Sequence, residues 1–250
     1  MFSNNRWFDL LGVPVFGGSL PEALSLIEEA VLRKRRMHVI TLNPEIMAHG
    51  LADPSFYQVL LSGELVVPDG KGIILASKFL GERPTERITG IELLRTLLAR
   101  GTEKGWTFYF LGSREAVVCR AVEKARMDFP GVQIVGFHHG FFDDDQKVIA
   151  DINRLSPDFL FVGLGSPRQE WWIYKHRSVL KTFVMMGVGG SFDVLSGFKE
   201  RAPQWMIRWG MEWLYRLIRE PWRMRRVMPA FWRFGVAVLK HKFCKSSHKV

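Results

Sequence analysis

The sequence of 250 residues contains little cysteine and no long apolar run. Its two cysteines, Cys119 and Cys244, do not have the spacing of a disulfide framework or a zinc site, so a reducing cytoplasm is the expected compartment. No apolar stretch approaches the roughly 20 residues that cross a bilayer, and residues 1–18 lack the basic and apolar regions of a signal peptide. We therefore expect a cytoplasmic chain that can lie on a membrane surface without crossing it.

The common nucleotide-binding fingerprints are also absent. GSREAVV (112–118) and PDGKGI (68–73) lack the G-x-x-x-x-G-K-[ST] spacing of a P-loop. No G-x-G-x-x-G follows the first predicted strand, and GVGGSF (187–192) fits that pattern poorly. A Rossmann-type oxidoreductase is therefore disfavoured, although it stays an alternative.

Short apolar segments that alternate with helical ones indicate the fold class. They are rich in Val, Ile and Phe with little polar alternation, which is typical of strands buried on both faces of a parallel sheet. The predicted strands are residues 37–43, 64–70, 106–112, 132–137, 157–165 and 182–190. We expect an α/β fold over residues 1–199, with a Rossmann-like, mostly parallel sheet and helices on both of its faces.

Positive charge and tryptophan are concentrated in the last fifth of the chain. Residues 201–250 hold twelve Lys or Arg side chains against Glu212 and Glu220, which accounts for the whole net charge of +10. Five of the nine tryptophans lie in the same part. The sequence therefore predicts a neutral body, residues 1–199, and a basic appendage, residues 200–250.

The appendage is expected to be entirely helical. Residues 201–219 read as one helix that carries Trp205, Trp209 and Trp213 in a single stripe. Pro221 ends or restarts it, and residues 221–242 continue as one or two helices broken near Pro229.

Polar residues and glycines gather where the predicted strands end. Ligands of open parallel sheets bind beyond the carboxyl ends of the strands, and glycine-rich turns before a helix let the backbone approach a phosphate. The residues at these ends include Thr41, Asn43, Asp69, Gly163, Gly165, Gly187 and Gly189. For Asp69 two interpretations are open and compatible: a turn residue before Gly70, or a general base at the edge of the sheet.

Three consecutive aspartates, Asp143 to Asp145, suggest either a metal site or a helix start. An Asp-x-Asp element binds a divalent metal in many nucleotide-sugar transferases, whereas FFDDDQKVIADINRL (141–155) is typical of an acidic helix N-terminus. His138 and His139 offer no ligand spacing. We favour the cap and expect no metal.

Six segments together resemble one family. TLNPEI, VVPDGKGI, ERITGIELL, FLFVGLGSPRQEWWI, VMMGVGGSFDVLSG and RAPQWMIRWGMEWLYRLIREPWR are similar, in order and spacing, to the WecG/TagA/CpsF bacterial glycosyltransferases, from about residue 10 to residue 233. The resemblance implies an inverting transferase that needs neither metal nor cofactor. Its donor would be a UDP-sugar, with N-acetylmannosamine, its uronate or another hexose, and its acceptor a polyprenyl diphosphate-linked sugar in teichoic acid, common antigen or capsule synthesis.

The resemblance also implies roles for particular residues. The base of the family falls on Asp69, and its pocket Thr and Asn fall on Thr41 and Asn43, with Leu42 where the family often has Pro. Further pocket residues fall on Arg87 and Gln169, beside the turns of Gly165 and Gly189. The arginines of the family's C-terminal pattern fall on Arg216, Arg223 and Arg226.

These roles have a physical rationale. At an ordinary pKa of about 3.9 Asp69 would be a weak base, which suffices if the proton leaves late from an oxocarbenium-like transition state. Without a metal, arginines would neutralise the departing diphosphate, because their guanidinium groups stay charged and bind phosphate oxygens in pairs.

The basic appendage admits rival interpretations. Charge with aromatic residues suits a nucleic acid, but tryptophans interleaved with Leu214, Leu217 and Ile218 are more typical of a helix at a lipid interface. We expect binding to an anionic membrane at the inner face of the cell membrane and no nucleic-acid partner. A basic helix merely packed on the body is the simplest alternative. Self-association through the docking surface of the appendage would give a homo-oligomer, and the sequence leaves that state open.

Overall fold

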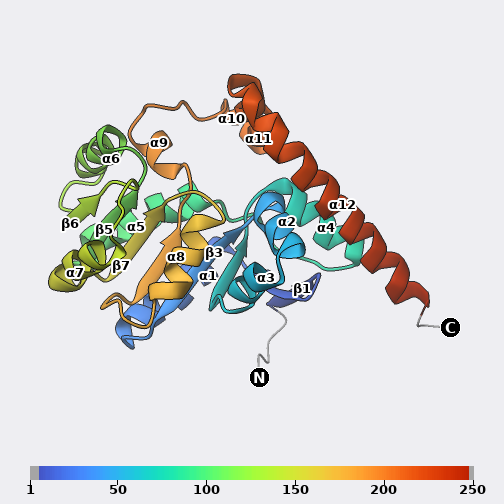
Figure 1. Cartoon of the computed structure of the whole chain (residues 1–250), viewed down its shortest axis with the longest axis horizontal. Coiled ribbons are helices and arrows are strands. Elements are labelled where there is room, and N and C mark those ends of the chain that lie inside the picture. Colours follow the sequence, from blue (N-terminus) through green and yellow to red (C-terminus); the bar gives the residue numbers. More distant parts are fainter. Residues whose placement is uncertain (1–5, 248–250) are drawn as a thin grey trace.

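A six-stranded parallel sheet organises the molecule (Figure 1). The computed structural model describes residues 6–247, and its strand order is β4-β3-β8-β7-β5-β6. In chain order the strands are β3 (Met37–Leu42), β4 (Leu65–Pro68), β5 (Thr107–Gly112), β6 (Gln133–His138), β7 (Phe159–Gly163) and β8 (Val184–Gly187). Every neighbouring pair is parallel, and each predicted segment contains or overlaps one strand. The predicted α/β class with a parallel sheet is confirmed.

Helices cover both faces of the sheet, as the strand composition predicts. Side chains that alternate along β5, such as Phe108 and Tyr109, enter separate apolar clusters on opposite faces. One face packs against α1 (Leu20–Leu32), α5 (Gly90–Lys104), α6 (Glu115–Asp128) and α9 (Ser191–Leu195). The other packs against α2 (Pro44–Ala52), α3 (Pro54–Leu61), α4 (Lys71–Leu80), α7 (Asp145–Leu155) and α8 (Arg168–His176). Because both faces are dry, polar alternation along the strands is absent.

A small antiparallel hairpin precedes the main sheet and is missing from the sequence prediction. It consists of β1 (Trp7–Leu10) and β2 (Val13–Phe16). Leu11 and Gly12 form its turn, both with positive φ, at 55° and 87°. This turn chemistry is what a two-residue hairpin needs, but Leu-Gly lacks the Asn-Gly or Asp-Gly signature by which such a turn is recognised.

The C-terminal segment, residues 200–247, is helical, but the long first helix expected there is wrong. Two short helices, α10 (Gln204–Arg208) and α11 (Glu212–Arg219), replace it. Gly210, at φ 68°, separates them, because a left-handed residue ends an α-helix. Trp205 and Trp209 therefore do not continue onto the helix of Trp213, and all three side chains are exposed.

The break predicted near Pro229 is also wrong. A 3-10 turn, η1 (Pro221–Arg223), leads into α12 (Met224–Ser247), which runs through Pro229. Ala230, Phe234 and Val238, spaced four apart, are buried, and the last two belong to the cluster that also holds residues of α2 and α4. Figure 1 shows α12 lying along these helices. This continuous apolar stripe offsets the hydrogen bond that proline cannot donate. Within residues 6–247 no helix combines the length and apolar character of a membrane span.

Candidate active site

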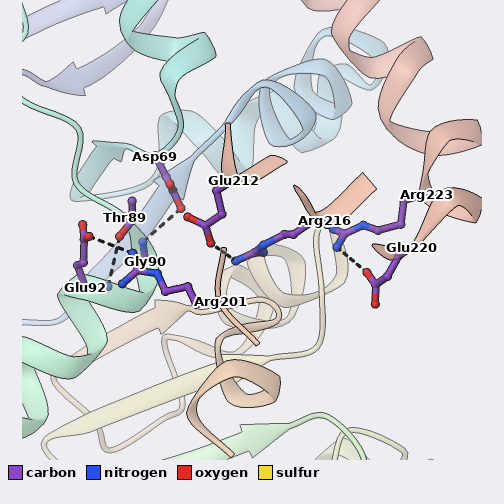
Figure 2. A network of polar contacts seen from close by, with 9 residues as sticks. All are labelled: Asp69, Thr89, Gly90, Glu92, Arg201, Glu212, Arg216, Glu220 and Arg223. Atoms are coloured by element: carbon purple, nitrogen blue, oxygen red, sulfur yellow. Dashed lines mark hydrogen bonds and ion pairs between the residues drawn. The ribbon is translucent and has the colours of Figure 1, made fainter. Parts of the chain in front are cut away.

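Asp69 lies at the carboxyl edge of the sheet, directly after β4. Its backbone N–H donates to the Leu42 carbonyl at 2.7 Å, which ties the end of β4 to the end of β3. Its carboxylate accepts a hydrogen bond from the backbone N–H of Gly90 at 3.2 Å, at the first residue of α5. Thr89 caps the same helix through its side chain. The turn therefore holds the Asp69 carboxylate rigidly against a helix N-terminus (Figure 2).

The surroundings of Asp69 make it a stronger base than an ordinary aspartate. Burial raises the pKa of Asp69 to about 6, and the hydrogen bond from Gly90 opposes this rise. The negative charge of Glu212 raises the pKa further, whereas Arg216 and Arg87 lower it. At neutral pH the carboxylate is mostly ionised and still accepts a proton more readily than it would at the ordinary value assumed from sequence.

The three C-terminal arginines pair with three different carboxylates. Arg216 contacts Glu212 at 2.7 Å and Arg223 contacts Glu220 at 2.9 Å. Arg226 reaches Glu45 in the first turn of α2, at 2.6 Å. Glu220 also binds Lys199 at 2.8 Å, which links η1 to the end of the body.

Of these three arginines, Arg216 is the one whose positive charge lowers the pKa of Asp69. Arg87, which lies before α5, lowers that pKa as well. Arg223 and Arg226 lie in the same segment of the chain and in ion pairs with Glu220 and Glu45. Each of the three guanidinium groups thus already contacts a carboxylate.

The other predicted pocket residues shape the strand ends. The buried Thr41 hydroxyl donates to the Gly187 carbonyl at 3.3 Å. Asn43 caps α2 by accepting from the Ile46 N–H at 3.0 Å. These contacts fix the turns after β3 and β8, so both side chains stabilise the local structure of the site.

Gln169 connects two of the glycine-rich turns. Its side chain is buried, accepts from the Gly189 N–H at 2.9 Å and donates to Glu170 at 2.7 Å. Gly165 and Gly189 have positive φ, 78° and 51°, and an added Cβ would meet nothing within 4 Å at either. The backbone of these turns therefore faces open space at both glycines.

The aspartate run acts as a helix start, as we favoured. Asp144 is the N-cap of α7 and accepts from the Gln146 N–H at 2.9 Å. Asp145 accepts from the indole N–H of Trp172 at 2.8 Å. In the part of the chain that the structure describes, no three His, Cys, Asp or Glu side chains are grouped as metal ligands.

Glu212 is a site residue that the sequence reasoning missed. Its side chain is 13% exposed, less than the 39% of its partner Arg216. The available signal was the spacing of the two, because an acidic residue four positions before an arginine on a helix predicts an ion pair. That this pair faces Asp69 follows from tertiary structure alone.

An open hollow lies in the C-terminal segment, away from Asp69. It has a volume of about 720 Å³ and is lined by Pro221, Trp222, Met224, Arg225, Met228 and Pro229. Several of these side chains are largely exposed, including Trp222 at 68%. The hollow therefore combines apolar side chains with one cation, Arg225.

In open parallel sheets, ligands bind beyond the carboxyl ends of the strands, and the Asp69 carboxylate lies at this edge of the sheet. The family described as "Glycosyl transferase WecG/TagA/CpsF family" matches residues 8–248, and the chain belongs to this family of glycosyltransferases. The family resemblance of the sequence motifs is thereby confirmed.

Curated relatives share most of the chain. A Bacillus spizizenii protein is 38% identical over 204 residues, 82% of this chain and 79% of its own length. A Bacillus subtilis protein is 34% identical, covering 92% and 90%, and one from Staphylococcus aureus strain MW2 is 30% identical, covering 99% and 96%. Each bears the name N-acetylglucosaminyldiphosphoundecaprenol N-acetyl-beta-D-mannosaminyltransferase.

Proposed function

We propose that the protein is an inverting, metal-independent glycosyltransferase. It moves a hexose, namely N-acetylmannosamine, its uronate or a related sugar, from UDP to a polyprenyl diphosphate-linked sugar in the synthesis of a cell-surface polysaccharide. The names of the relatives support this acceptor and the mannosamine unit. The observation that carries the proposal is the Asp69 carboxylate, which the Gly90 N–H holds in place and which is more basic than an ordinary aspartate, with Arg216 and Arg87 close enough to act on it.

The reaction is a single displacement. The acceptor hydroxyl oxygen forms a bond to the anomeric carbon while the bond from that carbon to the UDP oxygen breaks, and the hydroxyl proton passes to Asp69. Attack from the face opposite UDP inverts the anomeric centre. A pKa of Asp69 raised to about 6 by burial makes proton transfer easier than a carboxylate in water would allow.

Arginines neutralise the departing diphosphate in this proposal. Arg216, Arg223 and Arg226 already hold carboxylates in charge-assisted contacts. Diphosphate oxygens offer the same kind of acceptor with more charge, so they replace Glu220 and Glu45 on Arg223 and Arg226. The carboxylate partners keep the guanidinium groups oriented until the donor binds.

The C-terminal segment also supplies the contact with the membrane. Its exposed apolar side chains include Trp205, Trp209, Trp213, Ile218, Trp222, Met224, Met228 and Trp232. They are interspersed with arginines, a combination suited to burying indoles at the lipid interface while cations reach anionic headgroups. The protein would thus attach reversibly to the inner face of the cell membrane, where a polyprenyl-linked acceptor is embedded.

Release of UDP tests the transferase. A panel of UDP-sugars is offered with a synthetic lipid diphosphate-linked GlcNAc acceptor, and acceptor-dependent UDP release identifies the donor. Arg223→Ala should lower turnover by roughly a hundredfold or more, since it removes a cation that meets the leaving group. Arg219→Ala is the matched control, because Arg219 pairs with the exposed Glu200. Near-normal turnover of the Arg223 variant would contradict the assignment.

Membrane attachment needs its own variants, because deleting the whole segment would also remove the core residues Phe234 and Val238 and expose the apolar side chains of α2 and α4 on which they pack. The double variant Trp222→Ala, Trp232→Ala should sediment less with anionic vesicles than the wild type does, since both indoles are exposed. Leu32→Ala, at an exposed position on α1, is the control. Binding to duplex DNA across a salt series, without vesicle binding, would favour the nucleic-acid alternative.

A further inference from the structure

The turn that carries Asp69 is packed against the start of α11. Lys71, two residues beyond Asp69, donates from its ammonium group to the Trp209 carbonyl at 2.6 Å. Gly210 lies so close that an added Cβ would be 2.4 Å from the Lys71 side chain. The first residue of α11, Glu212, follows two positions later. Lys71 thus fixes where α11 begins relative to Asp69.

Glu212 is placed between two groups of the proposed reaction. Its carboxylate accepts from Arg216 at 2.7 Å, and its side chain is nearly enclosed. Figure 2 shows this carboxylate directed toward both Asp69 and Arg216. A nearly enclosed carboxylate is costly unless it has a partner, and Arg216, a proposed phosphate ligand, is that partner. Asp69, the proposed base, is instead the like charge that Glu212 repels.

The charges around Asp69 come from two elements. Glu212 and Arg216 face it from α11, and Arg87 faces it from the segment before α5. Further along, Glu92 of α5 pairs with Arg201 at 3.0 Å. Glu212 is therefore the anionic member of the group that acts on Asp69.

We propose that Glu212 is a positioning residue for the transfer: it aims Arg216 at the departing phosphate and places a second negative charge opposite Asp69. This inference rests on the proposed function. Unlike Glu45, which reaches Arg226 from α2, Glu212 stays in place when the diphosphate arrives, because it is one helical turn from Arg216 on the same helix. A negative charge that faces the base favours proton uptake by it.

The two effects of Glu212 separate in its variants. Glu212→Gln keeps an oxygen that accepts from Arg216 but removes the charge opposite Asp69, so the acid limb of the kcat profile should move to lower pH while KM for the donor changes little. Glu212→Ala also releases Arg216, so kcat should fall on the order of tenfold or more, as for lost supporting contacts, and KM for the donor should rise. Glu212→Asp should recover part of the loss.

Glu200→Gln is the matched control. Glu200 lies in the same C-terminal segment, is 75% exposed and pairs with Arg219. Glu200→Gln also removes one negative charge from the C-terminal segment, but from a position that does not face Asp69, so its pH profile should match that of the wild type. A merely structural Glu212 would lower thermal stability and leave the pH profile and the KM unchanged, which would overturn the inference.

Titration of Asp69 gives a readout that needs no activity. The side-chain carboxyl carbon of Asp69 is followed by NMR in aspartate-labelled protein and assigned by comparison with Asp69→Asn. We expect its midpoint to move to lower pH in Glu212→Gln and to stay in Glu200→Gln. If the Asp69 midpoint shifts in Glu212→Gln but the wild type transfers no sugar, the proposed function alone is contradicted. An unmoved midpoint in an active Glu212→Gln enzyme would sink the role of Glu212 alone.

Discussion

Replacing Asp69 by asparagine should abolish transfer and also make the protein more stable. Burial raises the pKa of this carboxyl from 3.8 to about 6, so the folded chain binds the proton more tightly than the unfolded chain does. Ionisation at neutral pH therefore destabilises the fold. Asparagine removes the charge and keeps an oxygen that accepts from the Gly90 N–H.

The size of the effect follows from linkage. Each unit of pKa difference corresponds to about 1.36 kcal/mol, so the difference at Asp69 amounts to about 3 kcal/mol at pH 7. Between 3.8 and about 6 the unfolded chain releases its proton first, and stability falls as the pH rises. The gain from asparagine should thus shrink to about 1.6 kcal/mol at pH 5 and vanish below the unfolded pKa.

Urea unfolding of both proteins at pH 7 and pH 5 measures these differences. Asp143→Asn is the control, since it removes one aspartate charge from an exposed position before α7. Its difference from the wild type should be small at both pH values. The reasoning is refuted if Asp69→Asn is no more stable than the wild type at pH 7, or if its gain is the same at both values.

Two further predictions concern structure around the site. Asn43→Ala should lower the free energy of unfolding by about 1 kcal/mol, because the Ile46 N–H loses its cap, whereas Asn43→Asp should retain it; equal urea midpoints for all three proteins would rule out the cap. Gly210→Ala should cost about 1–2 kcal/mol of left-handed strain, displace Lys71 and speed tryptic cleavage of the C-terminal segment. Gly81 also has a positive φ, 97°, but lies in open space, so Gly81→Ala should carry backbone strain without faster cleavage. Identical cleavage of both variants would contradict the role of the Lys71 contact.

The sheet could be predicted because its strands are short apolar runs whose burial on both faces leaves a compositional trace. The strand order could not, since it depends on which strands the crossovers place side by side. The C-terminal helices were mispredicted because the behaviour of two residues, Gly210 and Pro229, depends on tertiary contacts. Gly210 ends a helix through its left-handed backbone, beside a Lys71 side chain that leaves no room for a Cβ, and α12 passes Pro229 because Phe234 and Val238 are anchored in the core.

The sequence could predict which residues lie at the strand ends. It could not predict how their charges act on one another. Asp69 and Arg216 came from turn position and family motif. The raised pKa of Asp69 arises from enclosure by α5 and α11, which no local pattern encodes. The pairing of Arg226 with Glu45 joins residues far apart in the sequence.

The buried stripe of α12 limits how the site can open. Since Phe234 and Val238 share a core with the helices after β3 and β4, α12 cannot detach without unfolding part of the body. The helices before it have a small apolar cluster of their own around Met206 and Ile207. Residues 204–223 are therefore not a free arm: the Lys199–Glu220 ion pair and α12 hold the C-terminal end of this segment, and the contact of Lys71 with the Trp209 carbonyl holds its middle.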